Sequence, residues 1–175
     1  MSHYTVTVPV KPYIRKFVNY IEGDPILSSD QSRIWMIIRP CLEKSFCSGL
    51  SKKQIANQTL AFTDKITIHI PISKMRLYGH SVSVASIILI NRILENDFER
   101  ELSNYVERSI RDHVRYKGYK EALFAFAYEN QVDLEEDISF DGLKKIEYRY
   151  RTNIKKICST VVPSPKHYQQ HALVA

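Results

Sequence analysis

The sequence predicts a mainly α-helical α+β fold with a small two-stranded β element. Apolar residues recur at helical spacing in several long segments, whereas two segments alternate apolar and polar residues as half-buried strands do. A doubly wound α/β fold needs several alternating strands and helices, and two strands are too few to build one. With 175 residues, 44% of them hydrophobic, the chain suits a single domain over residues 1–160 and a loose tail over 161–175.

The two predicted strands resemble each other in sequence. Tyr4–Val8 alternates until Pro9 and Pro12 interrupt the pattern, and Lys65–Ile72 places its isoleucines on one face. The strings Thr-Val-Thr-Val-Pro-Val and Thr-Ile-His-Ile-Pro-Ile follow the same order of residue types. Because a lone strand leaves its backbone N–H and C=O groups unpaired, we predict that these two strands pair with each other.

Two helices are expected between the strands. The first covers residues 13–22, where aromatic and apolar residues are spaced by four, and Gly23 is placed to end it. The second covers residues 28–42, starts at serine and aspartate cap candidates, and contains Pro40. Proline removes a backbone donor and clashes with the preceding turn, so Pro40 should kink or divide this helix. The polar segment 46–58 is predicted to be a loop.

Three helices are expected in the second half of the chain. The longest begins at a serine cap at position 81 or 83 and runs to about His113. Its predicted core stripe is Val84, Ile87 or Ile88, Leu94, Phe98, Leu102, Tyr105 or Val106, and Ile110. The next helix covers residues 119–130. After an acidic connection over 131–137, a final helix capped by Ser139 should extend to about Cys158.

The final helix carries the functional prediction. At about 100° per residue its apolar residues fall within about 80° of each other, which predicts a buried stripe. That stripe consists of Leu143, Ile146, Tyr150, Ile154 and Ile157. The candidate nucleic-acid-binding residues occupy the remaining arc and are Lys144, Lys145, Tyr148, Arg149, Arg151, Lys155 and Lys156. Such a face can neutralise phosphates, and tyrosine or arginine can also reach bases. The alternative is a solvated helix face whose cations suit the helix dipole.

The chain as a whole has a formal net charge of +6, which favours double-stranded DNA as the partner. The last two helices, over 119–158, then form a helix-turn-helix-like pair with the final helix as the recognition helix. Its first residues, through Tyr148, would face the groove, and Arg149 and the later cations would follow the phosphates. Two features depart from the standard motif: the connection is about eight residues long rather than three or four, and it is acidic.

Two segments also carry a resemblance to a known group of proteins. The stretch from Asp137 to Lys145, continued by Tyr148-Arg149-Tyr150-Arg151, resembles the C-terminal element of small basic proteins encoded by bacteriophages and mobile elements of gut bacteria. The opening Val8–Phe17 is similar to the same group. The resemblance implies a DNA-binding or regulatory protein.

Other DNA-binding arrangements have competing interpretations. The β-α-α order of the opening segments is similar to that of ribbon-helix-helix proteins, in which Thr5 and Thr7 would face bases. A strand that clasps the helices is the interpretation we favour there. The span 44–76 is rich in lysine and contains Asp64 as its one acid. It is a second phosphate-contacting surface or a solvated loop.

Catalytic, metal and cofactor sites are not expected. The six histidines lack metal-ligand spacing, and Gly79–Ser83 approaches a nucleophile elbow but lacks its second glycine. Cys41, Cys47 and Cys158 are expected to be reduced thiols.

The segments that bear on localisation predict a soluble cytoplasmic protein. Residues 1–10 lack the basic segment followed by an apolar segment that is typical of a secretory signal. The apolar run Val82–Ile90 is too short to span a bilayer. Neither a membrane nor a small-molecule substrate is expected as a partner.

These observations predict a non-enzymatic DNA-binding protein, a regulator of a phage or mobile element. A homodimer or higher oligomer is expected, with the long helix 83–113 as the dimerisation element. The alternative is a small phage structural or assembly protein that makes protein–protein contacts through its helices. An exposed apolar patch, expected on the same long helix, would distinguish that alternative.

Overall fold

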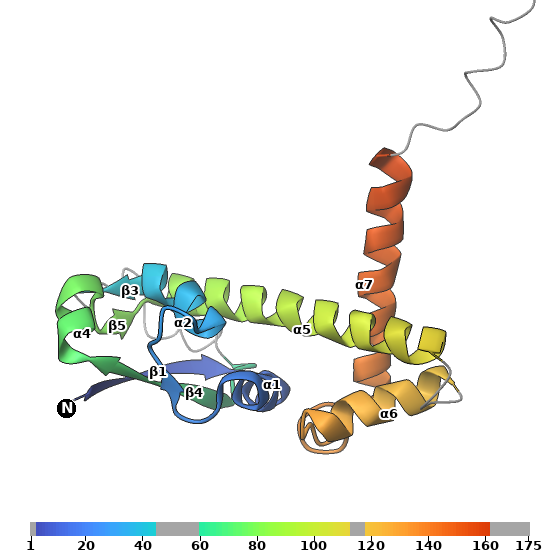
Figure 1. The fold of residues 1–175 in the computed structure, drawn as a ribbon, viewed down its shortest axis with the longest axis horizontal. Coiled ribbons are helices and arrows are strands. Elements are labelled where there is room, and N and C mark those ends of the chain that lie inside the picture. Colours follow the sequence, from blue (N-terminus) through green and yellow to red (C-terminus); the bar gives the residue numbers. More distant parts are fainter. Residues whose placement is uncertain (1–2, 45–59, 113–117, 162–175) are drawn as a thin grey trace, which may run out of the picture.

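The computed structural model describes residues 3–44, 60–112 and 118–161 and is organised along one long helix. This helix, α5 (Val84–Asp112), has 29 residues and extends along the length of the molecule (Figure 1). The sheets and the first helices lie along one end of α5. Helices α6 (Tyr119–Glu129) and α7 (Phe140–Val161) lie at the other end. The predicted loop 46–58 and all but the first residue of the predicted tail fall outside the described residues.

The predicted strand pairing is confirmed. Strand β1 (His3–Val10) runs antiparallel to β4 (Asp64–Pro71), with Val6 opposite Ile68. Because both strands alternate, the register places valines and isoleucines on the same buried face. The outward neighbours Thr5 and Thr7 are exposed.

The β structure is larger than the predicted two strands. A two-residue strand, β2 (Ile26–Leu27), pairs parallel to β4 and gives the sheet order β1-β4-β2. A separate ribbon forms between β3 (Leu42–Glu43) and β5 (Ser81–Val82). Two-residue strands carry no periodic pattern, so the sequence could not reveal them.

Two further details of the sheet correct the sequence prediction. Pro9 lies within β1 instead of ending it, which is compatible with the position of β1 at the sheet edge. The Pro9 carbonyl accepts a hydrogen bond of 2.8 Å from Nδ2 of Asn91, a buried residue of α5. At the other end, Ile72 is not part of the strand, because it begins the short helix α4 (Ile72–Tyr78), which was not predicted.

Helix α1 (Pro12–Glu22) confirms the first predicted helix. Pro12 occupies its first turn, where the missing N–H has no helical partner to lose. Gly23 ends it with a φ of 82°, a conformation that favours glycine. The helix buries Ile14, Phe17 and their neighbours in the core shared with the sheet and α5.

Helix α2 (Arg33–Ile38) begins later than predicted but is divided by proline as expected. The Oγ of Ser32 caps it by accepting a 3.0 Å hydrogen bond from the N–H of Trp35. At Pro40 the chain changes to the 3-10 helix η1 (Arg39–Cys41), which ends the α-helical hydrogen-bonding pattern.

The core stripe of α5 is confirmed over its central turns. Four predicted residues, Leu94, Phe98, Leu102 and Val106, are fully or almost fully buried. The ring of Phe98 contacts Tyr13, Phe17 and Phe126, at centroid distances of 4.9, 5.3 and 5.5 Å. Phe98 therefore joins α1, α5 and α6. Of the predicted pair at the start of the stripe, Ile87 packs against the core and Ile88 is exposed. The far end of the stripe differs, because Ile110 is exposed, and buried Ile90 was not predicted.

Two of the five residues in the predicted buried stripe of α7 are exposed, and Tyr150 is half-buried. Leu143 is buried and Ile146 packs against the core, but Ile154 and Ile157 are 43% and 58% exposed. The reason is that α7 rises steeply from the body and its later turns project beyond it (Figure 1). No element in the described part of the chain covers these turns.

Across the three described ranges, no helix has both the length and the apolar character needed to cross a membrane.

Phe98→Ala should lower the free energy of unfolding by about 3–5 kcal/mol, because it removes the ring that joins three helices. Leu89→Ala, on the same helix but half exposed, should change it by less than about 1 kcal/mol. Urea denaturation followed by circular dichroism measures both. Similar losses for the two variants would contradict the central role of Phe98.

Candidate nucleic-acid interface

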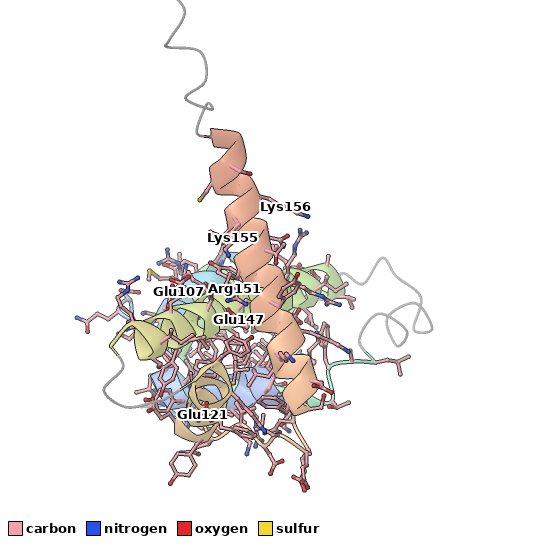
Figure 2. All side chains as sticks on the ribbon, turned by 90° about the vertical axis from the view of Figure 1, so that its right-hand side faces the viewer. Glu107, Glu121, Glu147, Arg151, Lys155 and Lys156 are labelled. Atoms are coloured by element: carbon pink, nitrogen blue, oxygen red, sulfur yellow. The ribbon has the colours of Figure 1, made fainter. Side chains whose placement is uncertain are left out.

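The predicted binding residues form two rows on the outer side of α7. Because residues three or four apart share a helix face, Lys144, Tyr148, Arg151 and Lys155 make one row and Lys145, Arg149 and Lys156 make the other. We call the two rows together the basic face. Six of the seven are exposed, whereas Arg151 is about one-third exposed. Figure 2 shows Lys155 and Lys156 on the part of α7 that stands beyond the body.

The first turn of α7 is positioned by a confirmed cap and a ring contact. Ser139 Oγ accepts a 3.1 Å hydrogen bond from the N–H of Gly142, and Ser139 O accepts one of 3.0 Å from the N–H of Leu143. Phe140 stacks on Phe124 of α6 with a centroid distance of 4.7 Å. These contacts fix where the basic face begins relative to α6.

The acidic connection between α6 and α7 folds onto itself. Asp133 Oδ1 accepts hydrogen bonds from the N–H groups of Glu135 and Glu136, at 2.7 and 3.0 Å, and these bonds lower the pKa of the Asp133 carboxyl. Asp137 accepts a bond from Asp133 N–H and lies 4.0 Å from Lys16 Nζ of α1. The connection occupies residues 130–139, so it is longer than the tight turn of a standard helix-turn-helix.

A buried carboxylate lies beneath the basic face. Glu147 has no exposed surface, and its Oε2 accepts a 2.6 Å hydrogen bond from the hydroxyl of Tyr119 on α6. Its Oε1 lies 3.4 Å from Nε of Arg151. The Arg151 guanidinium also sits over the Tyr119 ring, 5.6 Å from its centroid. We call this closed set the Tyr119–Glu147–Arg151 unit.

The electrostatics of this unit keep Tyr119 as a hydrogen-bond donor. Burial, the hydrogen bond to Glu147 and its negative charge all raise the pKa of Tyr119 above its usual value of 10.0. The phenol therefore stays protonated at neutral pH. The positive charge of Arg151 opposes this shift but is the smallest of the influences.

One cation of the second row, Arg149, interacts electrostatically with an acidic residue of α5. Burial and the nearby Glu95 raise the pKa of Glu99, and the positive charges of Arg149 and Lys11 oppose that increase. Arg149 is therefore close enough to Glu99 to interact with it across the α5–α7 interface. Part of its charge is compensated within the chain.

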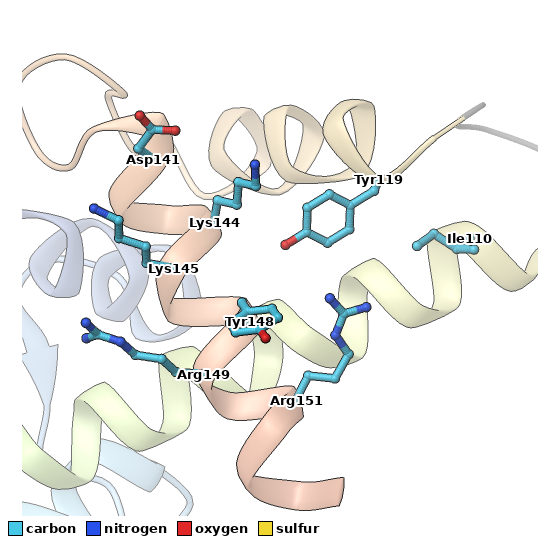
Figure 3. A pocket seen from close by; sticks show the side chains of 8 residues that line it. All are labelled: Ile110, Tyr119, Asp141, Lys144, Lys145, Tyr148, Arg149 and Arg151. Carbon is cyan, nitrogen blue, oxygen red and sulfur yellow. The ribbon is translucent and has the colours of Figure 1, made fainter.

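The basic face borders a pocket of about 690 Å³ between α5, α6 and α7 (Figure 3). In the figure, Lys145 and Arg149 extend from one side of α7, and Arg151 extends from the other toward Tyr119. The lining residues are Ile110, Tyr119, Asp141, Lys144, Lys145, Tyr148, Arg149 and Arg151.

The sequence predicted the cations of this site but not its other walls. Ile110 was expected in the core, and Tyr119 was not singled out. Tyr119 meets Glu147 over a separation of 28 residues, so local spacing could not have revealed the contact. A charged residue at the edge of an apolar stripe, Glu147, was the one available indication that a partner must approach α7 there.

The other predicted candidates are not brought together. Lys74 bonds to Ser28 O and Asp30 at 2.6 and 3.1 Å, while Lys65 and Arg76 extend from separate elements. Thr5 and Thr7 lie on β1, which pairs with β4 and whose opposite face is buried in the core. This agrees with the packing role that the sequence favoured for this strand.

The nucleophile-elbow candidate has structural contacts. Ser81 Oγ donates a 2.9 Å hydrogen bond to Glu43 O, and Ser83 Oγ caps α5 by accepting from Ser86 N–H. Gly79 packs so tightly against the Glu43 backbone that a Cβ would lie 2.4 Å from it. Within the described ranges, no group of three or more histidine, cysteine, aspartate or glutamate residues is arranged to hold a metal ion.

Comparison with models of known protein families, with curated proteins and with solved structures finds no match.

Tyr119→Phe should lower the free energy of unfolding by about 1.5–3 kcal/mol, because it removes the neutral donor to a buried carboxylate. Tyr128→Phe is the matched control on the same helix, since Tyr128 is 86% exposed, and it should change stability by less than about 0.5 kcal/mol. Urea denaturation at pH 7 measures both. Equal stability of the two variants would show that the Tyr119 hydroxyl does not stabilise Glu147.

Proposed function

We propose that the protein binds double-stranded DNA through the basic face of α7 and acts as a non-enzymatic regulator. The observation that carries this proposal is the concentration of six cations and Tyr148 on one helix whose last turns project from the body. Cations at such a surface release the counterions condensed on DNA, which is the main source of affinity for the duplex.

The two rows suit the geometry of a DNA groove. An α-helix fits into the major groove, which is about 12 Å wide and has a phosphate backbone along each side. Lys144 and Lys145 begin rows that are about 100° apart around the helix axis. Each row can therefore approach a different backbone while the residues between them face the bases.

Helix α6 supports α7 in this proposal as the first helix of a helix-turn-helix-like pair. The Phe124–Phe140 stack and the Tyr119–Glu147 hydrogen bond hold the two helices together at the start of α7. The acidic connection is directed toward Lys16 of α1, which limits its repulsion of phosphate at the basic face.

The double variant Lys145→Ala/Arg149→Ala should weaken binding to duplex DNA and reduce the slope of log affinity against log salt by about two, since each residue contacts about one phosphate. The control Lys65→Ala/Arg76→Ala removes the same charge from exposed positions on β4 and α4, at the other end of the molecule from α7, and should leave the slope nearly unchanged. The same control tests the span 44–76 as a second phosphate-contacting surface. Fluorescence anisotropy between about 50 and 200 mM salt measures both. If the wild-type protein does not bind duplex DNA even at about 50 mM salt, the DNA proposal is rejected.

Assembly with other protein chains is a second candidate, favoured by the exposed Ile154 and Ile157 of α7. These residues continue the line of the buried Leu143 and lie away from the basic face. A second copy of the chain is the occupant we propose, because two such helices can pair their apolar sides while both basic faces stay outward. The exposed apolar residues of α5 are less suited, since Ile110 lies far along that helix from the adjacent pair Ile88 and Leu89.

Ile154→Glu should shift the protein from dimer toward monomer, because it places a charge in the proposed contact. Leu89→Glu tests the original expectation that α5 forms the contact and should leave the dimer intact. Sedimentation velocity over a range of protein concentrations measures the oligomeric state. A wild-type monomer at every concentration, or dissociation by Leu89→Glu alone, would contradict pairing through α7.

A further inference from the structure

The pocket beside α7 is larger and more apolar than contacts with the phosphates of a duplex require. Its volume of about 690 Å³ lies within the range of sites that hold small organic molecules, and it is far larger than a phosphate group needs. Tyrosine rings and Ile110 contribute apolar surface, whereas two lysines and two arginines outweigh the single acid, Asp141, and make the lining positive. A ligand that matches both must combine a flat apolar part with an anionic part.

One wall of the pocket is held in place before any ligand arrives. The Tyr119–Glu147–Arg151 unit fixes the Tyr119 ring by its 2.6 Å hydrogen bond and fixes Arg151 by the ion pair and by the ring below it. Arg151 is paired with Glu147 through its Nε, 3.4 Å from Oε1, so its terminal N–H groups remain as donors for a ligand in the pocket. A preformed cation of this kind binds an anion with little loss of side-chain entropy.

The other tyrosine of the pocket has an exposed ring. Tyr148 is 61% exposed and lies between Lys144 and Arg151 along the same row. Figure 3 shows its ring on the outer side of α7, with Lys144 above it and Arg151 beside it. An exposed aromatic ring between cations is the arrangement with which proteins stack an unpaired base and hold its phosphate.

We infer that this pocket binds one unpaired nucleotide, with the base stacked on Tyr148 and the phosphate at the preformed cation Arg151 beside it. The inference rests on the proposed DNA binding and specifies part of it. A paired base inside a duplex already stacks on neighbours at both faces, so it offers no face to Tyr148. The ligand is therefore an extrahelical or single-stranded nucleotide beside the duplex, or a free nucleotide with the same chemistry.

The test uses three labelled duplexes of the same sequence: one fully paired, one with a single extrahelical nucleotide, and one with an abasic residue at that extrahelical position. Anisotropy at about 50 mM salt should show that the wild-type protein prefers the extrahelical base by on the order of tenfold over both other probes. Tyr148→Ala should abolish the preference. Tyr128→Ala removes an exposed tyrosine from α6, away from the pocket, and should retain it.

Equal affinity for the three probes, or a preference that survives Tyr148→Ala, would overturn a nucleotide of the DNA strand as the ligand. The DNA proposal is judged separately, by the salt dependence of binding to the fully paired probe. Calorimetric titration with a deoxynucleoside monophosphate tests whether the ligand is a free nucleotide. If the monophosphate binds the wild-type protein but not Tyr148→Ala, and the three duplexes bind equally well, the pocket is assigned to a free nucleotide. Absence of both effects would overturn the inference.

Discussion

The ring contacts around Phe98 are the interaction on which the rest of the molecule depends. Phe98 lies on the longest helix and touches residues of α1 and α6, so one buried side chain connects the sheet-bearing end to the end that carries α7. If this cluster loosened, α6 would lose its fixed position on α5. Tyr119 would then no longer be held against Glu147, and the shape of the basic face would change with it.

Glu147 makes the candidate site sensitive to packing as well as to charge. A fully buried carboxylate is costly unless it is hydrogen-bonded or paired with a positive charge. Here Tyr119 of the neighbouring helix donates a hydrogen bond to Oε2, and Arg151, one turn further along α7, forms an ion pair with Oε1. The same arrangement explains why Arg151 is less exposed than the other cations. The cations of the basic face therefore differ in their availability: Lys144, Lys145 and Arg149 are exposed, whereas Arg151 is paired with Glu147 of the chain itself.

The features that the sequence predicted correctly carry either a long periodic pattern or a single-residue signal such as a proline or a helix cap. The pairing of β1 with β4, the division of the second helix at Pro40, the Ser139 cap and the centre of α5 follow from local rules that tertiary structure did not override. Short elements such as β2 and α4 were not predicted, because two to seven residues are too few to define a period. In the site, the cations were predicted from one helix, but Tyr119 and Ile110 belong to other helices and were not. The exposure of Ile154 could not be predicted either, because amphipathicity shows which side of a helix is apolar and not whether a partner covers it.

The projection of α7 has a geometric consequence for any elongated partner. A helix of 22 residues is about 33 Å long, close to one turn of B-form DNA, and its later turns are exposed from 153 to 159. A duplex laid along those turns would meet the helix before it met the sheets, so the bulk of the protein would impose little steric hindrance. The angle at which the duplex approaches would then be set by the first turns of α7, which are anchored by Phe140 and by the contact with Tyr119 of α6. The rest of the helix would act as a rigid spacer between the body of the protein and its partner.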